Sequence, residues 1–269
     1  MGDYLHFYYD MKLEFSCMVS KHYFKNIIEP KSTLRQKIVH LHYDITPCDM
    51  LGNNQDGFGN QIIYGNCFKP HDSFEIKMEG LAETKQDAKE EKEKENSRIF
   101  LYPSEYTKPG KHLYEFFNSL MSADKERFST YTACEIAEYL MTKLQTVFSY
   151  QSGTSSVNSV AEEVFLQGCG VCQDYAHILI TLLRLASVPA RYVVGLIQGE
   201  GESHAWVEVL QDGFWYGIDP TNGTWVNENY IKISSGRDYQ DCCISKGMFE
   251  GFANQKLSIS VSVVRERKT

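Results

Sequence analysis

The sequence lacks any long apolar run and any basic start. No window approaches the roughly 20 apolar residues that a membrane-spanning helix needs, so we expect no membrane partner. The opening residues, Met-Gly-Asp-Tyr-Leu-His-Phe, do not combine a basic start with an apolar stretch. Because a secretory signal peptide has both features, we expect no signal peptide and a cytoplasmic location.

An excess of positive charge is also missing. Lysine and arginine number 27 against 35 aspartates and glutamates, and the formal net charge is -8. A general nucleic-acid binder needs clustered cations to neutralise phosphates, so nucleic acid is not an expected partner. Hydrophobic residues make up 42% of the chain and charged residues 23%, which is typical of a soluble protein with a core of normal size.

Cysteine, in contrast, is abundant, with eight residues at positions 17, 48, 67, 134, 169, 172, 242 and 243. With no export signal, we expect reduced thiols rather than disulfides. Most of these cysteines should behave as small buried hydrophobes.

Short segments rich in β-branched and aromatic residues fill the N-terminal part of the chain. Strands are predicted at residues 4–9, 12–19, 35–45, 61–68 and 73–79. Turn-forming residues at 47–49 and 53–60 separate some of them. Several short strands at this spacing predict an antiparallel β-sandwich.

Residues 84–97 (TKQDAKEEKEKENS) contain almost no apolar side chain. Such a segment cannot bury one face, so we expect a solvated loop or an exposed helix. We place the domain boundary shortly after it. The prediction is an N-terminal β-sandwich domain at residues 1–105 and a catalytic domain at residues 106–269.

Both helical and strand patterns occur in the second half. Apolar spacing predicts helices at residues 111–121, 133–146, 160–166 and 172–187, the last of which ends before Pro189. Strand patterns occur at residues 191–197, 204–211, 214–219, 230–234 and 257–265. This combination predicts an α+β domain.

Cys172 follows a glycine-bearing turn and opens the predicted helix 172–187. Backbone N–H groups at a helix N-terminus favour a thiolate, which is the nucleophilic form of cysteine. The same groups can donate to the oxyanion that forms when a thiolate attacks a carbonyl. This position therefore predicts a catalytic nucleophile.

A thiolate nucleophile needs an imidazole as proton acceptor and a third group that orients the imidazole. His204 begins a predicted strand 32 residues after Cys172, and Asp219 ends the next strand before the turn Pro220-Thr221-Asn222-Gly223. If the two strands are antiparallel neighbours, His204 and Asp219 lie side by side. We expect both to face the start of the helix.

Four segments in order carry a resemblance to bacterial transglutaminase-like proteins: 170–177 (GVCQDYAH), 189–193 (PARYV), 204–208 (HAWVE) and 217–223 (GIDPTNG). Residues 236–241 (GRDYQD) resemble the C-terminal signature of that family, and residues 56–60 (DGFGN) are similar to its N-terminal β domain. The resemblance implies a triad of Cys172, His204 and Asp219 in a papain-like core that acts on an amide carbonyl through a thioester. Many members of that family are described as cysteine proteases, so the resemblance also implies this activity.

Several residues near the nucleophile are candidates for supporting roles. Tyr150 could supply an oxyanion donor, and Gln173 is expected to be exposed at the mouth of the site. Asp174 is expected to stabilise the helix N-terminus. Trp206 should pack around the triad, although it could line a substrate groove instead. His177, five residues into the helix, is expected to be a packing or hydrogen-bonding residue.

The pair Cys169 and Cys172 also allows a redox motif, or half of a zinc site completed by Cys242 and Cys243. Adjacent cysteines are poor paired zinc ligands, and the first βα unit of a thioredoxin-like fold is absent. We therefore expect no metal and no cofactor.

The expected function is thiol-dependent hydrolysis of an amide bond in a peptide or protein. A transglutaminase would use the same site with an amine in place of water. A non-catalytic binding scaffold that retains the fold is a further alternative. A peptide deglycosylase is less favoured, because the zinc-binding cysteine pairs typical of those enzymes are absent upstream of Cys172. The sequence does not determine the substrate or the oligomeric state.

Overall fold

The N-terminal strand β1 (Asp3–Asn26) organises the β-rich part of the molecule. The computed structural model describes residues 3–87, 89–92, 97–154 and 156–266. The first half of β1 pairs with β5 (His71–Thr84) and β16 (Gln255–Arg265), and its second half pairs with β4 (Gln61–Cys67) and β15 (Ser245–Glu250). Farther out, β2 (Gln36–Thr46) pairs with β5, and β3 (Met50–Gln55) pairs with β4. All of these pairings are antiparallel.

Two layers therefore share β1, and their inner faces pack against each other through aromatic rings. Phe24 on β1 lies 4.8 Å from Phe74 on β5, measured between ring centroids. Leu5, Phe7, Tyr9 and Met11 alternate with more exposed residues along β1 and are buried in the core. The predicted antiparallel β region is confirmed, but the strands predicted at residues 4–9 and 12–19 form one continuous strand.

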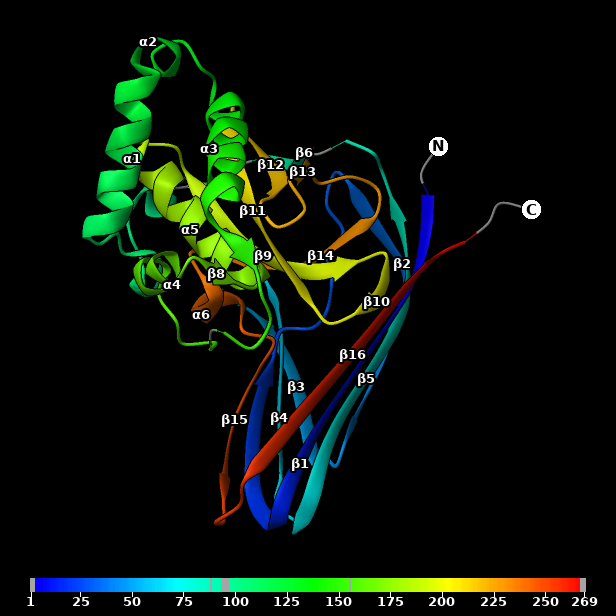
Figure 1. Ribbon diagram of the computed structural model, residues 1–269. Coiled ribbons are helices and arrows are strands. Elements are labelled where there is room, and N and C mark those ends of the chain that lie inside the picture. The colour runs from blue at the N-terminus through cyan, green and yellow to red at the C-terminus, as the bar shows by residue number, and fades with distance from the viewer. Residues whose placement is uncertain (1–2, 88, 93–96, 155, 267–269) are drawn as a thin grey trace.

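A second, antiparallel sheet forms the centre of the other half of the molecule (Figure 1). Its strand order is β13 (Thr224–Trp225), β12 (Phe214–Asp219), β11 (His204–Gln211), β9 (Ala190–Ile197) and β14 (Tyr230–Gly236). A short strand, β6 (Lys89–Lys92), pairs with β12. We refer to these strands as the catalytic sheet.

Helices gather beside the catalytic sheet, as Figure 1 shows. They are α1 (Lys111–Ala123), α2 (Lys125–Phe128), α3 (Ala133–Val147), α4 (Ala161–Gln167), α5 (Cys172–Leu185) and α6 (Tyr239–Cys242). Short elements complete the fold: η1 (Ser97–Leu101), η2 (Glu105–Thr107), β7 (Ser149–Tyr150), β8 (Cys169–Gly170) and β10 (Gly199–Gly201). The predicted α+β architecture is confirmed. Within the described residues, no helix is both long and apolar enough to cross a bilayer.

Helix α5 is the central helix of this half. Every residue from Gln173 to Arg184 is buried, because α5 lies against α3 and α4 on one side and against β9 and β11 on the other. A helix buried all round is held in place by its neighbours on every side. The nucleophile candidate at its first residue is therefore fixed to a rigid element.

The expectation of a solvated segment at residues 84–97 holds for residues 85–87, which are exposed, but is wrong for residues 89–91. Residues 89–92 form β6, Glu90 is fully buried against Arg35, and Glu91 accepts from Arg191 at 2.8 Å. Buried acids are tolerated because cations from distant strands pair with them. A window of local sequence cannot reveal those cations. Residues 88 and 93–96 of this segment lie outside the described residues.

The predicted boundary at residue 105 does not separate the two sheets. The strands β15 and β16 follow the boundary but belong to the β1 sheet, whereas β6 precedes it and belongs to the catalytic sheet. The chain thus leaves the β1 sheet, builds the catalytic half and returns to the β1 sheet at its C-terminal end. The two halves are tied together by strands at both ends of the chain.

Side chains from the N-terminal half cover β14, which is an edge strand of the catalytic sheet. Gln36 makes two bonds to Lys232, accepting from its N–H at 2.7 Å and donating to its carbonyl at 2.8 Å. Asn60 makes the same pair of bonds to Ser235, each 2.9 Å long. Arg35 donates to the carbonyl of Tyr230 at 2.7 Å. The side-chain amides of Gln36 and Asn60 therefore take the place of a neighbouring strand. We call these two pairs of hydrogen bonds the amide clamps.

Replacing Gln36 with Ala should lower the free energy of unfolding by about 2–4 kcal/mol, since two buried backbone groups of Lys232 lose their partner. Urea unfolding followed by tryptophan fluorescence measures this loss. The control is Gln86→Ala, because Gln86 is exposed. Equal unfolding midpoints for Gln36→Ala and Gln86→Ala would show that the clamp does not contribute.

Candidate active site

Cys172 is the first residue of α5, and its side chain is partly buried. Asp174 is the third residue of α5. Its carboxylate accepts from the backbone N–H of Val171 at 2.8 Å and so caps the helix start. A Cβ at Gly170 would collide with this carboxylate, which explains the glycine in the turn. The local sequence thus builds a tight, capped helix start that presents the thiol.

His204 begins β11, and Asp219 ends the neighbouring antiparallel strand β12. The Nε2 atom of His204 lies 2.8 Å from Oδ2 of Asp219. The other side of the imidazole is hydrogen-bonded to the thiol of Cys172. Since Nε2 is engaged with Asp219, Nδ1 is the nitrogen left for the thiol. The three predicted residues therefore form one hydrogen-bonded chain, and the predicted adjacency of His204 and Asp219 is confirmed.

Asp219 is fully buried and surrounded by donors. Its Oδ1 accepts from the backbone N–H groups of Thr221 and Asn222, and its Oδ2 accepts from the Asn222 amide at 2.8 Å and the Tyr230 hydroxyl at 2.9 Å. Burial raises the pKa of Asp219, but the hydrogen bonds from His204, Asn222 and Tyr230 outweigh it and lower the pKa below its usual value. The carboxylate is therefore ionised and held in one orientation.

The charge of His204 reflects the same balance. Burial lowers its pKa, whereas the hydrogen bonds and negative charges of Asp219 and Cys172 raise it, and the result is a pKa of about 10. The imidazole is thus protonated at neutral pH when it faces an ionised thiol. An imidazolium in this position can later give its proton to a leaving group.

The four supporting candidates have different outcomes. Tyr150 is 60% exposed. Partial burial is the main cause that raises the pKa of its hydroxyl, and the negative charge of the nearby Cys172 raises it further. The role of Tyr150 as an oxyanion donor stays a prediction. Gln173 is not exposed at the mouth: it is 9% exposed, and its amide donates to the carbonyl of Val157 at 3.1 Å. Asp174 stabilises the helix start as expected.

Trp206 packs against the triad and does not line a groove, because it is fully buried. Its ring stacks with that of His204 at a centroid distance of 6.4 Å and an interplanar angle of 27°. It also meets the ring of Tyr230 edge to face at 5.5 Å. Trp206 therefore fixes the plane of the imidazole.

His177 is a packing residue, as predicted. It is fully buried, its Nε2 accepts from the backbone N–H of Tyr239 at 3.1 Å, and its ring stacks on Tyr106 at 5.4 Å. Burial lowers the pKa of His177 to about 3, so the ring is neutral. A neutral, enclosed ring of this kind supports the fold rather than the chemistry.

Sequence reasoning did not assign roles to Asn222 and Tyr230. Asn222 had a local signal, because an asparagine three residues after an aspartate in a Pro- and Gly-containing turn often bonds within the turn. Gly223 completes that turn with φ of +65°. Tyr230 had no local signal, because it starts β14, which is not adjacent to β11 or β12 in the sheet.

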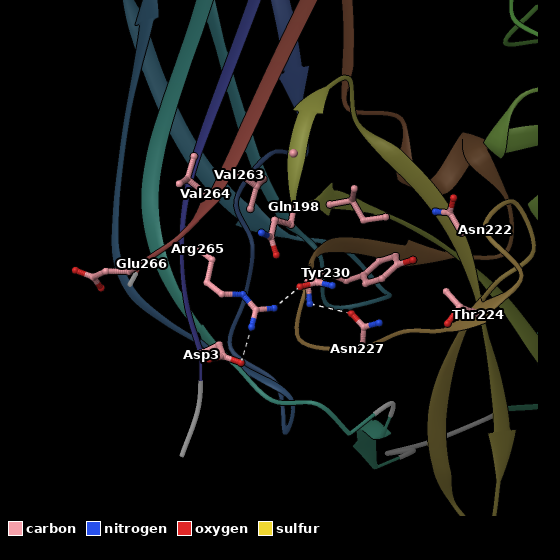
Figure 2. Close-up of a pocket in the computed structure, with 13 residues that line it drawn as sticks. Asp3, Gln198, Asn222, Thr224, Asn227, Tyr230, Val263, Val264, Arg265 and Glu266 are labelled. Carbon is pink, nitrogen blue, oxygen red and sulfur yellow. Dashed lines mark hydrogen bonds and ion pairs between the residues drawn. The ribbon is translucent and has the colours of Figure 1, made fainter. Parts of the chain in front are cut away.

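Asn222 and Tyr230 also line an open groove of about 1270 Å³ (Figure 2). Figure 2 shows residues of the catalytic half on one side and, on the other, Arg265 at the end of β16 and Glu266, which follows it. Arg265 is held there by Asp3 at 3.2 Å and Glu228 at 3.3 Å. The groove therefore borders two side chains that hold Asp219.

The eight cysteines are free thiols. Cys242 and Cys243 are buried, and Cys243 contacts the hydroxyl of Tyr239 at 3.3 Å. Among the residues that the structure describes, no three His, Cys, Asp or Glu side chains converge as metal ligands would.

Comparisons with known protein families match two segments of the chain. Residues 5–83 match the bacterial transglutaminase-like N-terminal region, and residues 120–220 match the transglutaminase-like superfamily. The second match contains Cys172, His204 and Asp219. It therefore places all three candidates inside the transglutaminase-like core.

Similar proteins are found in mycobacteria and among solved structures. An uncharacterized protein of Mycobacterium bovis is 29% identical over 283 residues, which cover 93% of this chain and 89% of that protein. An uncharacterized protein of Mycobacterium leprae is 27% identical over 264 residues, which cover 88% and 90%. The crystal structure of a "Putative Cysteine Protease" from Cytophaga hutchinsonii matches with a TM-score of 0.75 at 18% identity and covers 100% of this chain and 92% of that one. The structural match shows a shared fold.

Replacing Asp219 with Asn should lower the pKa of His204 from about 10, because the hydrogen bond and the negative charge of Asp219, which both raise it, are weakened or lost. An NMR titration of the imidazole signals measures this change, with His204→Gln to identify the resonance. Asp212→Asn in the neighbouring exposed turn is the matched control. An unchanged titration of His204 in Asp219→Asn would contradict the proposed charge balance.

Proposed function

Since this chain carries a transglutaminase-like core behind a bacterial transglutaminase-like N-terminal region, we propose that it is a cysteine hydrolase of peptide or protein amide bonds. The nucleophile is Cys172, the general base and acid is His204, and Asp219 orients the imidazole. The observation that carries the proposal is the position of His204, bonded to Asp219 at 2.8 Å and to the thiol at the start of α5. We further propose a cytoplasmic location.

In the acylation step, the Cys172 thiolate, whose proton His204 already holds as an imidazolium, attacks the amide carbonyl. Negative charge develops on the carbonyl oxygen. We assign the stabilisation of this charge to the backbone N–H groups at the start of α5 and to the hydroxyl of Tyr150. His204 then returns the proton to the departing amine, and the C–N bond breaks to leave a thioester on Cys172.

In the deacylation step, His204 acts as a base again and takes a proton from water as the water attacks the thioester carbonyl. The C–S bond breaks, the carboxylic acid leaves and the thiol is restored. Asp219 keeps the imidazole in the tautomer that this cycle requires, because its Oδ2 accepts the Nε2 proton of His204.

Access to the thiol supports a large substrate rather than a small enclosed one. The thiol is only partly buried, and the neighbouring Tyr150 is 60% exposed. Residues 149–150 and 169–170 form a short parallel pair, β7 and β8, that carries Tyr150 up to the nucleophile. A peptide segment can reach a site that opens to the surface in this way.

Replacing Cys172 with Ala should reduce peptide cleavage by at least about 1,000-fold, because the thiol that is paired with His204 and attacks the carbonyl is removed. Release of aminomethylcoumarin from a mixture of peptide amides measures the rate. Acid quenching followed by mass spectrometry should locate the acyl group on the peptide that contains Cys172. Cleavage that persists in Cys172→Ala would overturn the assignment.

Cys17→Ala is the control for the loss of a thiol elsewhere, since Cys17 is exposed in the β1 sheet. Adding a primary amine to the same reaction distinguishes the two acyl acceptors. Hydrolysis gives the free acid whether or not the amine is present, whereas a transglutaminase gives the amide of the added amine.

The decline of activity at alkaline pH should follow the loss of the proton from the imidazolium of His204. Its pKa is raised to about 10, so the imidazolium needed to protonate the leaving amine persists at neutral pH and is lost as the pH rises through about 10. We expect kcat/KM to fall in that range. A fall centred near pH 6.5 instead would show that His204 is not held by Asp219 and Cys172 during turnover.

A further inference from the structure

A cluster of five charged side chains, none of them a triad residue, links the catalytic sheet to Lys31 of the N-terminal half. Glu208 is bonded to Arg191 at 2.5 Å and to Lys232 at 2.8 Å. Glu91 lies 2.8 Å from Arg191, 3.4 Å from Lys232 and 3.9 Å from Lys31. The cluster therefore holds three cations and two anions, so it carries one uncompensated positive charge.

Burial makes this imbalance costly. The side chains of Glu208 and Lys232 are fully buried, and that of Arg191 is 8% exposed. An uncompensated charge in such a place is unfavourable because water cannot solvate it. A bound anion would remove the imbalance.

Lys31 is the member with the weakest pairing. Its ammonium group lies 3.9 Å from the carboxylate of Glu91, and its side chain is 20% exposed. Burial, followed by repulsion from Lys232, lowers the pKa of Lys31 despite the attraction of Glu91. The excess charge of the cluster is therefore concentrated on a lysine that can still reach a ligand.

Lys31, Glu91 and Arg191 all line a cavity of about 670 Å³. This volume lies in the range of small-molecule sites. The wall adds one acid, Asp56, and one base, Lys92, which leave the excess of one positive charge unchanged. The Asp56 carboxylate is itself satisfied by its own loop, because it accepts from Phe58 and Asn60.

Two further features of the wall suit an organic anion. Ser235 lines the cavity, is 1% exposed, and its hydroxyl has no hydrogen-bond partner among the described residues. A buried hydroxyl without a partner is expected to bond a ligand or water. The wall also contains the polar residues Ser32 and Gln55, and its apolar and aromatic part consists of Phe58, Ile99, Phe100 and Trp215.

We propose that this cavity binds a small monocarboxylic acid with an apolar or aromatic body. The carboxylate bonds to the ammonium of Lys31 and accepts from the hydroxyl of Ser235, and the body lies against Phe58, Phe100 and Trp215. One negative charge neutralises the cluster, whereas a doubly charged anion would reverse its sign. The site lies where the N-terminal residues 31–32 and 55–59 meet the strands β6, β9, β12 and β14, so the ligand braces the two halves.

The test uses the full-length protein and phenylacetate as the probe, in thermal unfolding and isothermal titration. At ten times its dissociation constant, phenylacetate should raise the unfolding temperature by roughly 2–4 °C. The neutral analogue 2-phenylethanol should not, because it lacks the charge. Lys31→Met and Ser235→Ala should each weaken phenylacetate binding by at least about tenfold, whereas Lys111→Met on the exposed face of α1 should bind like the wild type.

Lys31→Met should also unfold at the same temperature as the unliganded wild type or higher, because it removes an uncompensated charge. No binding of phenylacetate, or equal binding to wild type and Lys31→Met, would overturn the proposal. Binding of inorganic phosphate but not of phenylacetate through Lys31 would overturn the carboxylate assignment. The test does not require catalytic activity, so it is independent of the proposed function.

Discussion

The amide clamps between the N-terminal half and β14 are the constraint on which the rest of the structure depends. Gln36 and Asn60 satisfy backbone groups of an edge strand that would otherwise be buried without partners. The strand β14 begins with Tyr230, which holds Asp219, and it pairs with β9, which pairs in turn with the strand of His204. The β1 sheet therefore fixes the outer edge of the sheet on which two of the three triad residues lie.

A second connection runs through the C-terminal strand. The strand β16 pairs with β1 on one side and with β10 on the other, and β10 lies in the connection that leads into His204. Arg265 on β16 bonds to Asp3 and to Glu228, two residues before Tyr230. Figure 2 shows this end of β16 facing Tyr230 across the open groove. The two ends of the chain thus support the segments next to His204 and Tyr230, and the N-terminal half is part of the scaffold of the candidate site.

Much of the catalytic half could be predicted, because its signals are local. The helix start at Cys172 and the strands that carry His204 and Asp219 follow from apolar spacing, glycine and proline. The antiparallel pairing of neighbouring strands then brings His204 and Asp219 together. Asp174 could be assigned to the helix start for the same reason, since a helix cap involves residues three apart.

The errors have a common cause, which is pairing between residues far apart in the sequence. Glu90 is predicted to be solvated but is buried, because it pairs with Arg35, which lies 55 positions earlier in the sequence. Gln173 is predicted to be exposed at the mouth of the site, but its amide donates a hydrogen bond to the carbonyl of Val157. Residues 245–250 and 255–265 are predicted to belong to the catalytic domain, but they form β15 and β16 and pair with β1. No local sequence signal indicates that pairing. Tyr230 escaped notice because its hydroxyl reaches Asp219 from a strand that is not a neighbour of β12.

The central claim is that His204 and Asp219 activate one thiol among eight. The most direct measurement is the rate of iodoacetamide alkylation of each cysteine at mildly acidic pH, with peptide mass mapping, in wild type and in His204→Ala. Cys172 should react fastest in the wild type, because His204 holds its proton, and should lose this advantage in His204→Ala. If Cys172 reacts no faster than the exposed Cys17, or keeps its rate without His204, the proposed thiolate and imidazolium pair does not exist.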